Sequence, residues 1–399
     1  MKSERSWGRL GLKYNIWKDC RRVPLPELLD FIVDNRGKTV PTVNQNEACN
    51  VVLIATNCIR NENLYPVYEK IRFISEDTYK TWFRSHPIPG DIIFVNKGTP
   101  GRVCLCPDII DFCIAQDMMA FRADSNKLYN KYLLAVLRSR MMQEQIRITS
   151  VGDTIPHFKK EFLKDLYIPV PPMEIQRIIG DYYYNLSQKI ELNKKINENL
   201  EQQAQVIFKS WFVDFEPFGG AMPDDWRIGM LSEIAEISSG KRPPMRQADK
   251  TDNVYIPLVG AASVMGYTNE SNHRDKILVI GRVGTHGIVQ RFNVPCWTSD
   301  NTLVITSPYY EYTYQVLKQI DYTAMNRGST QPLITQGDMN KAEILLPDEE
   351  LILKYERLVG ILFAQHEHNQ SENVYLANLR DTLLPKLMNG EIDVSQVQI

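Results

Sequence analysis

The sequence repeats itself at one fixed distance, and this repeat restricts the fold more than any other feature. Residues between 168 and 200 recur 176 positions later (344 minus 168) with no change of spacing. The matched pairs are Ile168 with Ile344, Pro171 with Pro347, Glu174 with Glu350, Leu186 with Leu362, Asn193 with Asn369, Asn197 with Asn373 and Leu200 with Leu376. Because loops accept insertions more readily than packed elements do, the constant offset indicates a spacer of one length in both copies.

Shorter motifs upstream repeat at larger offsets. "KGTPGRV" at 97–103 matches "VGTHGIV" at 283–289 at an offset of 186 (283 minus 97), and Gly37 matches Gly240 at an offset of 203 (240 minus 37). "SVGDTIPHF" at 150–158 then matches "NRGSTQPLI" at 326–334, already at 176 (326 minus 150). The decline indicates two copies of one plan, with extra loop residues in the first copy.

The spacer itself has the pattern of a long helix over 173–212, with no proline and with Gly180 as its poorest helix former. Its apolar and polar seam positions fall largely three or four apart, namely Ile175, Ile179, Tyr182, Leu186, Asn193, Ile196, Leu200, Ile207 and Trp211, with Leu362, Asn369 and Leu376 in the second copy. About forty helical residues extend roughly 60 Å, and an apolar stripe of that length needs a partner. We expect the second copy, from Glu349 to about Leu384, to pair with the first as an antiparallel coiled coil.

Two details of this coiled coil are predicted separately. Lys189 and Asn193 interrupt the apolar seam near its middle, a kind of polar break that can fix the register of two helices. Pro385 lies where the first copy has Lys209, so the second helix is expected to kink or stop there.

The remaining segments predict globular domains, since 399 residues suit two domains better than one core. Short apolar runs at 51–56, 91–95, 276–281 and 301–306 favour strands, and 130–146 favours a helix. The fold class is therefore α+β, with two pseudo-symmetric mixed α/β domains separated by an antiparallel coiled coil of two long helices. The predicted segments are a leader (1–21), domain 1 (22–171), a central helix (172–212), a Gly- and Pro-rich linker (213–225), domain 2 (226–347), a distal helix (348–390) and a tail (391–399).

Several enzymatic and metal-binding functions lack their motifs. "NRGKT" ends like a phosphate-binding loop, but the glycine required five positions before Gly37 is Ile32. No Asn-Pro-Pro-aromatic, Asp-Pro-Pro-Tyr or G-x-G-x-x-G signature of an adenine methyltransferase occurs, and no nuclease carboxylate cluster assembles. Cys104, Cys106 and Cys113 lack nearby partners for a zinc site and are interpreted as buried thiols. His366 and His368, two apart on a predicted helix, point apart and are interpreted as solvated.

At this point a resemblance adds to the pattern. The segment "YIPVPPMEIQRIIGDYYYNLSQKIELNKKINENLEQQAQVIFKSWFVDFEPF" resembles the central conserved region of specificity subunits of type I restriction-modification enzymes, and "LLPKLMNGEI" resembles their distal conserved region. The similarity covers nearly the whole chain, although in the second copy "LLPDEEL" at 345–351 replaces the Pro-rich entry that is typical of the family. The resemblance implies that the two globular domains are target-recognition domains and that the chain itself is not an enzyme.

The same resemblance implies partners and cofactors. Such a subunit binds double-stranded DNA at an interrupted target and holds two modification subunits, which methylate adenine with S-adenosylmethionine. Two restriction subunits, which are motor nucleases, add cleavage that depends on ATP and Mg²⁺. No cofactor is expected in this chain. Neither an apolar stretch of about 18 residues nor a signal peptide is found, so we expect a cytoplasmic protein that has no membrane partner.

The net charge of −2 predicts no overall attraction to DNA, so any basic surface must be local. Loops that match in the two copies are the best candidates, because equivalent loops on pseudo-symmetric domains would face the same duplex. The predicted DNA-binding residues are Arg36, Lys38, Lys97, Thr99, Arg102, Asp153, Thr154 and His157 in the first copy, and Lys241, Arg242, Arg282, Thr285, His286, Arg327, Ser329, Thr330 and Gln331 in the second. Arg36, Lys38, Lys241 and Arg242 are predicted phosphate contacts.

Two other functions stay open at the level of the residues. The chain could be a coiled-coil scaffold that joins two protein-binding modules without recognising DNA. It could also methylate DNA alone, but the missing cofactor and adenine motifs argue against this. Salt-sensitive binding to an interrupted duplex separates the first alternative from DNA recognition.

Overall fold

The two predicted copies share one sheet topology. The computed structural model describes residues 15–35, 37, 39–45, 50–152, 154–283, 287–325 and 333–392. By their internal contacts, the described parts of 1–195 and 369–399 form one compact unit, and those of 196–368 form a second. Each unit therefore contains one globular domain together with part of each long helix. The predicted segments instead treat each long helix as a separate part of the chain, so the two divisions have different limits.

In unit 1, the main sheet has the strand order β2-β8-β5-β6 and a smaller sheet has the order β4-β3-β7. The strands of the main sheet are β2 (Leu29–Asp34), β5 (Ile92–Val95), β6 (Val103–Leu105) and β8 (Met118–Ala123). Those of the smaller sheet are β3 (Asn50–Ile54), β4 (Arg72–Ser75) and β7 (Phe112–Ile114), with β3 and β7 parallel. An antiparallel pair, β1 (Arg21–Pro24) and β9 (Tyr167–Val170), begins and ends the domain.

Unit 2 repeats this plan strand by strand. Its main sheet has the order β11-β17-β14-β15 and its smaller sheet β13-β12-β16, with β12 and β16 parallel. The strands are β11 (Glu236–Ser239), β12 (Ile256–Val259), β13 (Val264–Thr268), β14 (Ile277–Gly281), β15 (Gln290–Phe292), β16 (Trp297–Thr298) and β17 (Thr302–Thr306). The antiparallel pair β10 (Arg227–Met230) and β18 (Glu343–Leu346) again encloses the domain. The predicted strands at 51–56, 91–95, 276–281 and 301–306 correspond to β3, β5, β14 and β17.

Short helices cover the sheets. They are α1 (Ile16–Asp19), α2 (Glu76–Thr81), α3 (Asn130–Arg138), α4 (Arg140–Thr149), α6 (Tyr310–Gln319) and α7 (Gln336–Asn340), with 3₁₀ turns at Leu25–Leu28, Thr56–Cys58, Lys160–Asp165, Glu216–Phe218 and Leu231–Glu233. The prediction of one helix over 130–146 is wrong, because Ser139 is extended (ψ 147°) between α3 and α4. Its hydroxyl accepts a hydrogen bond from the Met142 amide (3.3 Å), so it begins a new helix.

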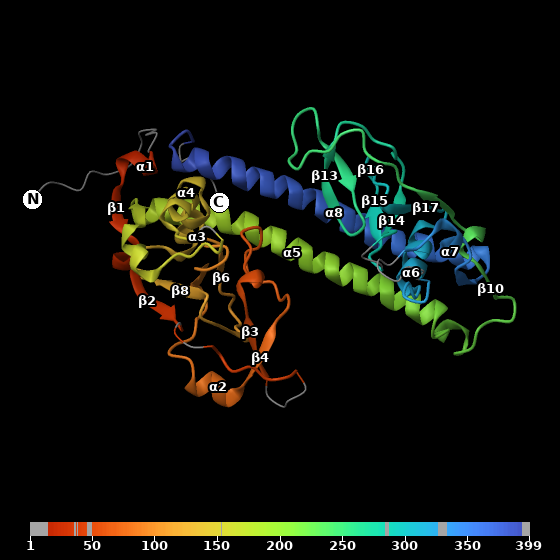
Figure 1. The fold of residues 1–399 in the computed structure, drawn as a ribbon, viewed down its shortest axis with the longest axis horizontal. Helices are drawn as coiled ribbons and strands as arrows, with labels where there is room; N and C mark the ends of the chain where they lie inside the picture. The colour runs from red at the N-terminus through yellow and green to blue at the C-terminus, as the bar shows by residue number, and fades with distance from the viewer. Residues whose placement is uncertain are drawn as a thin grey trace, which may run out of the picture. The chain divides into compact units, whose positions relative to one another are not determined.

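The two long helices are α5 (Met173–Phe212) and α8 (Glu349–Met388), each of 40 residues (Figure 1). In unit 1, Arg380 Nη1 of α8 donates to Ser187 Oγ of α5 (3.3 Å), and Asn193 donates to Asn373 (2.9 Å). In unit 2, Asn197 Nδ2 donates to the His366 carbonyl (3.2 Å). In unit 1, later residues of α5 meet earlier residues of α8, which is the predicted antiparallel order.

The seam differs from the prediction in its register. Ile179, Asn193 and Asn369 are buried, and Ile175, Tyr182, Leu186, Leu200, Ile207, Trp211, Leu362 and Leu376 are half-buried. Ile196 is instead 46% exposed, because neighbouring Asn197 is buried and bonded to α8. Other residues that the prediction omitted are also buried on α5, namely Tyr183, Ile190, Ala204, Phe208 and Phe212.

The helix α8 does not stop at Pro385, which lies inside its last turn. Proline removes one backbone donor, and close to a helix end this costs a single hydrogen bond. The amide of Asn389 still donates to the Pro385 carbonyl (2.8 Å), so the helix continues to Met388.

Each unit has its own core. In unit 1, buried residues of the main sheet, α3 and the start of α5 pack with the end of α8, including Phe94, Tyr132, Ile179 and Leu384. Ile16 and Trp17, from the end of the predicted leader, join this core. In unit 2, aromatic side chains dominate, including Phe208, Tyr312, Tyr355 and Phe363. The long helices are thus part of both cores rather than attached to their surfaces.

Candidate nucleic-acid interface

In unit 1, the structure brings the two matched loops together. Lys97 and His157 form an isolated antiparallel bridge. The Phe158 amide donates to the Asn96 carbonyl (2.7 Å), and the Gly98 amide donates to the Pro156 carbonyl (2.9 Å). Gly98 has φ +85°, a conformation that side chains disfavour, so this glycine permits the turn. Residues 60 positions apart (157 minus 97) therefore lie on one surface.

Unit 2 holds its equivalent loops in the same way. Val283 and Leu333 form an isolated antiparallel bridge, and the Ile334 amide donates to the Arg282 carbonyl (3.0 Å). By the repeat offsets, Val283 and Leu333 are the counterparts of Lys97 and His157. The same backbone hydrogen bond therefore recurs at equivalent positions of both domains, although the side chains differ.

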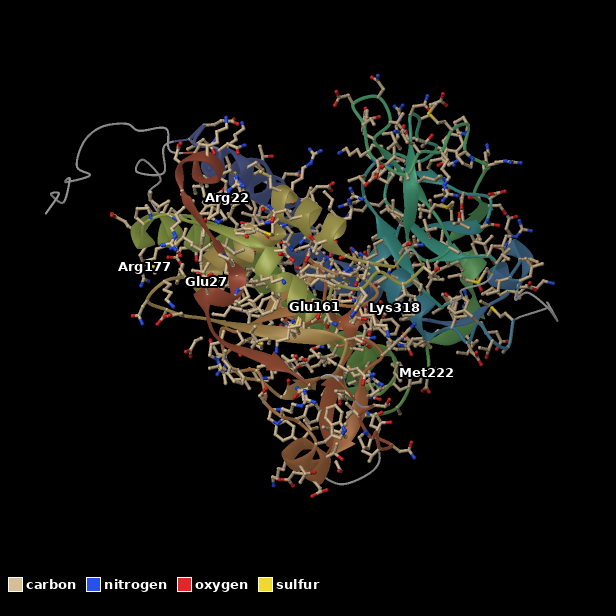
Figure 2. The ribbon with its side chains drawn as sticks, turned by 60° about the vertical axis from the view of Figure 1, so that its left-hand side comes forward. Arg22, Glu27, Glu161, Arg177, Met222 and Lys318 are labelled. Atoms are coloured by element: carbon tan, nitrogen blue, oxygen red, sulfur yellow. The ribbon has the colours of Figure 1, made fainter. Side chains whose placement is uncertain are left out.

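The described candidate residues of unit 1 are mostly accessible. Lys97, Arg102 and Thr154 are exposed, and Thr99 and His157 are half-buried. Lys97 and Arg102 make no ion pair with any described carboxylate, whereas the nearby Lys159 pairs with Glu161 (3.7 Å), which is labelled in Figure 2. The exposed Lys97 and Arg102 supply positive charge of the kind that phosphate contacts use.

In unit 2, Arg282 is half-buried and Lys241 and Arg242 are exposed. Hydrogen bonds fix the backbone of the loop that carries Lys241 and Arg242. The Gly240 amide donates to the Thr302 carbonyl (3.0 Å), and the Lys241 amide donates to the Thr298 carbonyl (2.9 Å). Trp297 Nε1 donates to the Lys241 carbonyl (2.8 Å). Burial, and secondarily the charge of Lys241, lowers the pKa of His273, which favours the neutral imidazole.

Gly37 and Gly240 match in the repeat but serve different purposes. Gly37 has φ +124°, so it permits a backbone conformation that other residues avoid. Gly240 instead allows close approach, because a Cβ atom there would clash with the carbonyl oxygen of Ser299. The glycines therefore support two differently built loops.

Nine of the predicted residues lie outside the described part of the chain, so their positions are not discussed. These residues are Arg36, Lys38, Asp153, Thr285, His286, Arg327, Ser329, Thr330 and Gln331.

Sequence reasoning missed a third loop beside the other two. In unit 1, the Asn96 amide donates to the Asp117 carbonyl (3.0 Å), and in unit 2 the Arg282 amide donates to the Asn301 carbonyl (2.9 Å). These turns lack the glycine or proline that usually marks a turn. The available signal was that "AQDMMAF" at 115–121 and "SDNTLVI" at 299–305 each place polar residues directly before an apolar run, at an offset of 184 (299 minus 115).

Some charged residues of α5 contact the globular domains. Glu191 accepts from the Leu64 amide (3.1 Å) and pairs with Lys194 (3.1 Å), and Glu201 accepts from Tyr314 (2.8 Å). His366 is half-buried rather than solvated, and burial lowers its pKa. Lys195 and Glu198 are exposed, as is His368.

In the described part of the chain, the cysteines form no metal site and the helices provide no membrane span. Cys104, Cys106 and Cys113 are buried free thiols, and burial raises the pKa of Cys113 to about 12, which disfavours the thiolate that binds metals. Across the described residues, no group of three or more His, Cys, Asp or Glu side chains could hold a metal ion. Nor is any helix in that part of the chain long and apolar enough to span a membrane. A hollow of about 700 Å³ near the start of α5 is lined by both Glu27 and Lys127, so it lacks the uniform positive charge of a DNA site.

Comparison with known proteins agrees with this geometry. The family model described as "Type I restriction modification DNA specificity domain" matches residues 19–202 and 223–355, which is more than half of the chain. The chain belongs to this family. The chain is also similar to the MjaIX specificity subunit of Methanocaldococcus jannaschii, a type I restriction enzyme subunit that is 28% identical over 306 residues, 67% of this chain and 70% of the relative.

Two further comparisons extend over more of the chain. The HindI specificity subunit of Haemophilus influenzae, also of a type I restriction enzyme, is 24% identical over 397 residues, 76% of this chain and 86% of the relative. The crystal structure of a type I restriction-modification S subunit from M. genitalium matches with a TM-score of 0.56 at 18% identity, over 94% of this chain and 98% of the other. At that identity the structural match shows a shared fold.

Proposed function

We propose that this chain is the non-catalytic DNA-recognition subunit of a type I restriction-modification enzyme and that it reads an interrupted, two-part target. One observation carries the proposal: the hydrogen bond from Phe158 to Asn96 recurs as the bond from Ile334 to Arg282. Two domains that build the same loop surface suit two separate sites on one regular polymer. Because the loop side chains differ between the domains, the two half-sites need not be palindromic.

The long helices supply the gap between the half-sites in this proposal. Each has 40 residues, which corresponds to about 60 Å of helix. Recognition elements one turn of DNA apart need a spacing of roughly 34 Å, with a fixed rotational phase. A helical spacer of constant length meets both needs, since helix length and side-chain register are fixed by packing.

Partner subunits supply the chemistry in this proposal. Two modification subunits would methylate adenine with S-adenosylmethionine, and two restriction subunits would cleave unmodified DNA with ATP and Mg²⁺. Membership of the specificity family supports this assignment. Exposed apolar side chains on α8, Leu358 and Ile361 in unit 2 and Val374 and Tyr375 in unit 1, offer contact area that a modification subunit would cover.

Methylation mapping of genomic DNA tests the proposal directly. A host expressing this chain with its neighbouring modification subunit is compared with a matched strain that lacks only this chain. We expect one interrupted adenine motif that is present in the first strain and absent from the second. The motif would give both half-sites and the gap between them.

The control separates recognition from scaffolding. The modification subunit is first recovered bound to this chain. If it then methylates no motif, or if it methylates the same motif when the chain is absent, DNA recognition is wrong and a protein scaffold is the better explanation. Binding to the duplex that carries the motif should also weaken steeply as salt rises, because phosphate contacts release counterions.

A further inference from the structure

Two tight turns occupy equivalent positions beside the candidate DNA-binding loops. Turn 1 (Ala115–Met118) joins β7 to β8, and turn 2 (Ser299–Thr302) joins β16 to β17. Each is closed by the same hydrogen bond between its first and fourth residues, from Met118 to Ala115 (3.3 Å) and from Thr302 to Ser299 (3.1 Å). The conserved geometry leaves two central residues at the tip of each turn.

A single residue fixes each turn against the other loops. The Asn96 amide donates to Asp117 of turn 1, while the Asn96 carbonyl accepts from Phe158. In unit 2, the Arg282 amide donates to Asn301 of turn 2, while the Arg282 carbonyl accepts from Ile334. Because both bonds involve the backbone, each turn stays in place whatever side chains it carries.

The tips of the turns carry short polar side chains. Gln116 and Asp117 are half-buried, and Asp300 and Asn301 are exposed. None of these four side chains makes a hydrogen bond to another residue that the structure describes. Gln116 and Asp117 also line a cavity of about 100 Å³ whose other polar walls include Thr56 and Arg72. The donors and acceptors of both tips are therefore available to a ligand.

The turns and the basic loops carry side chains of different charge. Lys97, Arg102, Lys241 and Arg242 suit phosphate, whereas an aspartate on the same surface would repel it. Carboxylates and amides are favourable where they meet base edges, since Asp accepts from the N4 amino group of cytosine and Gln or Asn pairs with adenine. An acid at the tip of a loop fixed beside cations is thus explained by contact with a base.

We propose that turn 1 and turn 2 are base-reading elements, in which Gln116–Asp117 and Asp300–Asn301 contact base edges in one half-site each. The proposal rests on the proposed DNA-recognition function and adds specificity-determining residues to it. Phosphate contacts from the basic loops hold the duplex, and the two turns discriminate between base pairs.

The test is methylation mapping with the full chain and its modification subunit. The variants are Gln116→Ala in turn 1 and Asp300→Ala in turn 2. Each is expected to relax one base pair in one half of the motif and to leave the other half unchanged. Losing one base contact should lower discrimination at that pair by at least about fivefold. The two variants should affect opposite halves.

Matched controls lie at the far ends of the same sheets. Glu236 is exposed and pairs with Thr306, at the end of β17 that is remote from turn 2. Asp30 is exposed on β2, whose Leu29 end pairs with the remote end of β8. Glu236→Ala and Asp30→Ala should keep the wild-type motif and extent of methylation.

Conservative variants keep the test decisive if an alanine variant unfolds. Asp300→Asn and Gln116→Glu preserve side-chain shape but change hydrogen-bonding pattern, so each should alter base preference at an unchanged melting temperature. If these variants keep the wild-type motif, the turns do not read bases, although the proposed function would stand. If instead deletion of the chain leaves the motif in place, the proposed function itself is wrong.

Discussion

Asn193 Nδ2 on α5 donates a hydrogen bond to Asn373 Oδ1 on α8 (2.9 Å), inside the interface of unit 1. Asn193 is 1% exposed and also donates to Glu372 (2.7 Å), which pairs with Lys189 (3.4 Å). The two donors of this buried amide are paired in only one alignment, because a shift of either helix leaves them without acceptors. The predicted polar break at Lys189 and Asn193 is thus a network that favours one register.

We expect Asn193→Leu to lower the free energy of unfolding by about 1–3 kcal/mol, since the half-buried acceptors on Glu372 and Asn373 lose their buried amide donor. Urea unfolding measures the loss, and Asn185→Leu, an exposed site on the same helix, should change stability by less than about 0.5 kcal/mol. The double variant Asn193→Leu with Asn373→Leu should lose less than the sum of the single losses. Additive losses would show that the two residues do not act as a pair.

The two glycines inside the long helices give opposite predictions for one substitution. A Cβ atom at Gly180 would lie 2.6 Å from the amide nitrogen of Tyr132 in α3, whereas nothing lies within 4 Å at Gly360. Gly180→Ala should destabilise unit 1 by about 1–3 kcal/mol through overpacking against backbone. Gly360→Ala should stabilise the protein by up to about 1 kcal/mol, because alanine is the better helix former. Thermal unfolding of both variants is the check, and equal shifts would contradict the close approach of α3 to α5.

The structure also shows what the sequence could and could not predict. The fixed offset identified the helices and the two copies, because packing keeps helix length constant while loops vary. The register of the seam was missed at Ile196 and Asn197, since a hydrophobic pattern cannot show that a buried asparagine has an acceptor on the other helix. The break at Ser139 was missed for a similar reason, because a serine inside an apolar run becomes a helix cap only through its local conformation.

The loops of the candidate site could likewise be predicted only in part. Gly98 and Gly101 made the loop at 97–103 recognisable, because glycines with positive φ mark such turns. Turn 1 and turn 2 carry no such residue, and only the backbone bonds of Asn96 and Arg282 place them beside the matched loops. Contacts between residues far apart in sequence were therefore the missing information.

Glu356 should make the stability of unit 2 depend on pH. Its side chain accepts from the Tyr312 amide at the start of α6 (2.6 Å), and burial raises its pKa from 4.5 to about 7. The folded state therefore binds a proton more tightly than the unfolded state does. The free energy of unfolding from this group falls as pH rises from about 4.5 to about 7, then remains low.

Glu356→Gln keeps an acceptor for the Tyr312 amide but cannot ionise. We expect it to match the wild type near pH 4.5 and to exceed it by up to about 3 kcal/mol above pH 7. Urea unfolding at pH 5, 6, 7 and 8 gives the difference, with Glu350→Gln on the exposed surface of α8 as control. A difference that does not change with pH would show that Glu356 does not titrate in this range.

If the two long helices set the distance between the half-sites, as the proposed function holds, then their length determines the gap in the DNA target. One heptad is inserted into each helix, after Lys195 in α5 and after His368 in α8, where the two compact units divide. Seven residues lengthen each helix by about 10 Å, which corresponds to roughly 3 base pairs at 3.4 Å each. Methylation mapping should therefore find both half-sites unchanged and the gap longer by about 3 base pairs. Insertion into α5 alone is the control, since it disturbs the pairing with α8 and should abolish methylation. If the double insertion folds and methylates the original motif with its original gap, the helices do not set the distance between the half-sites.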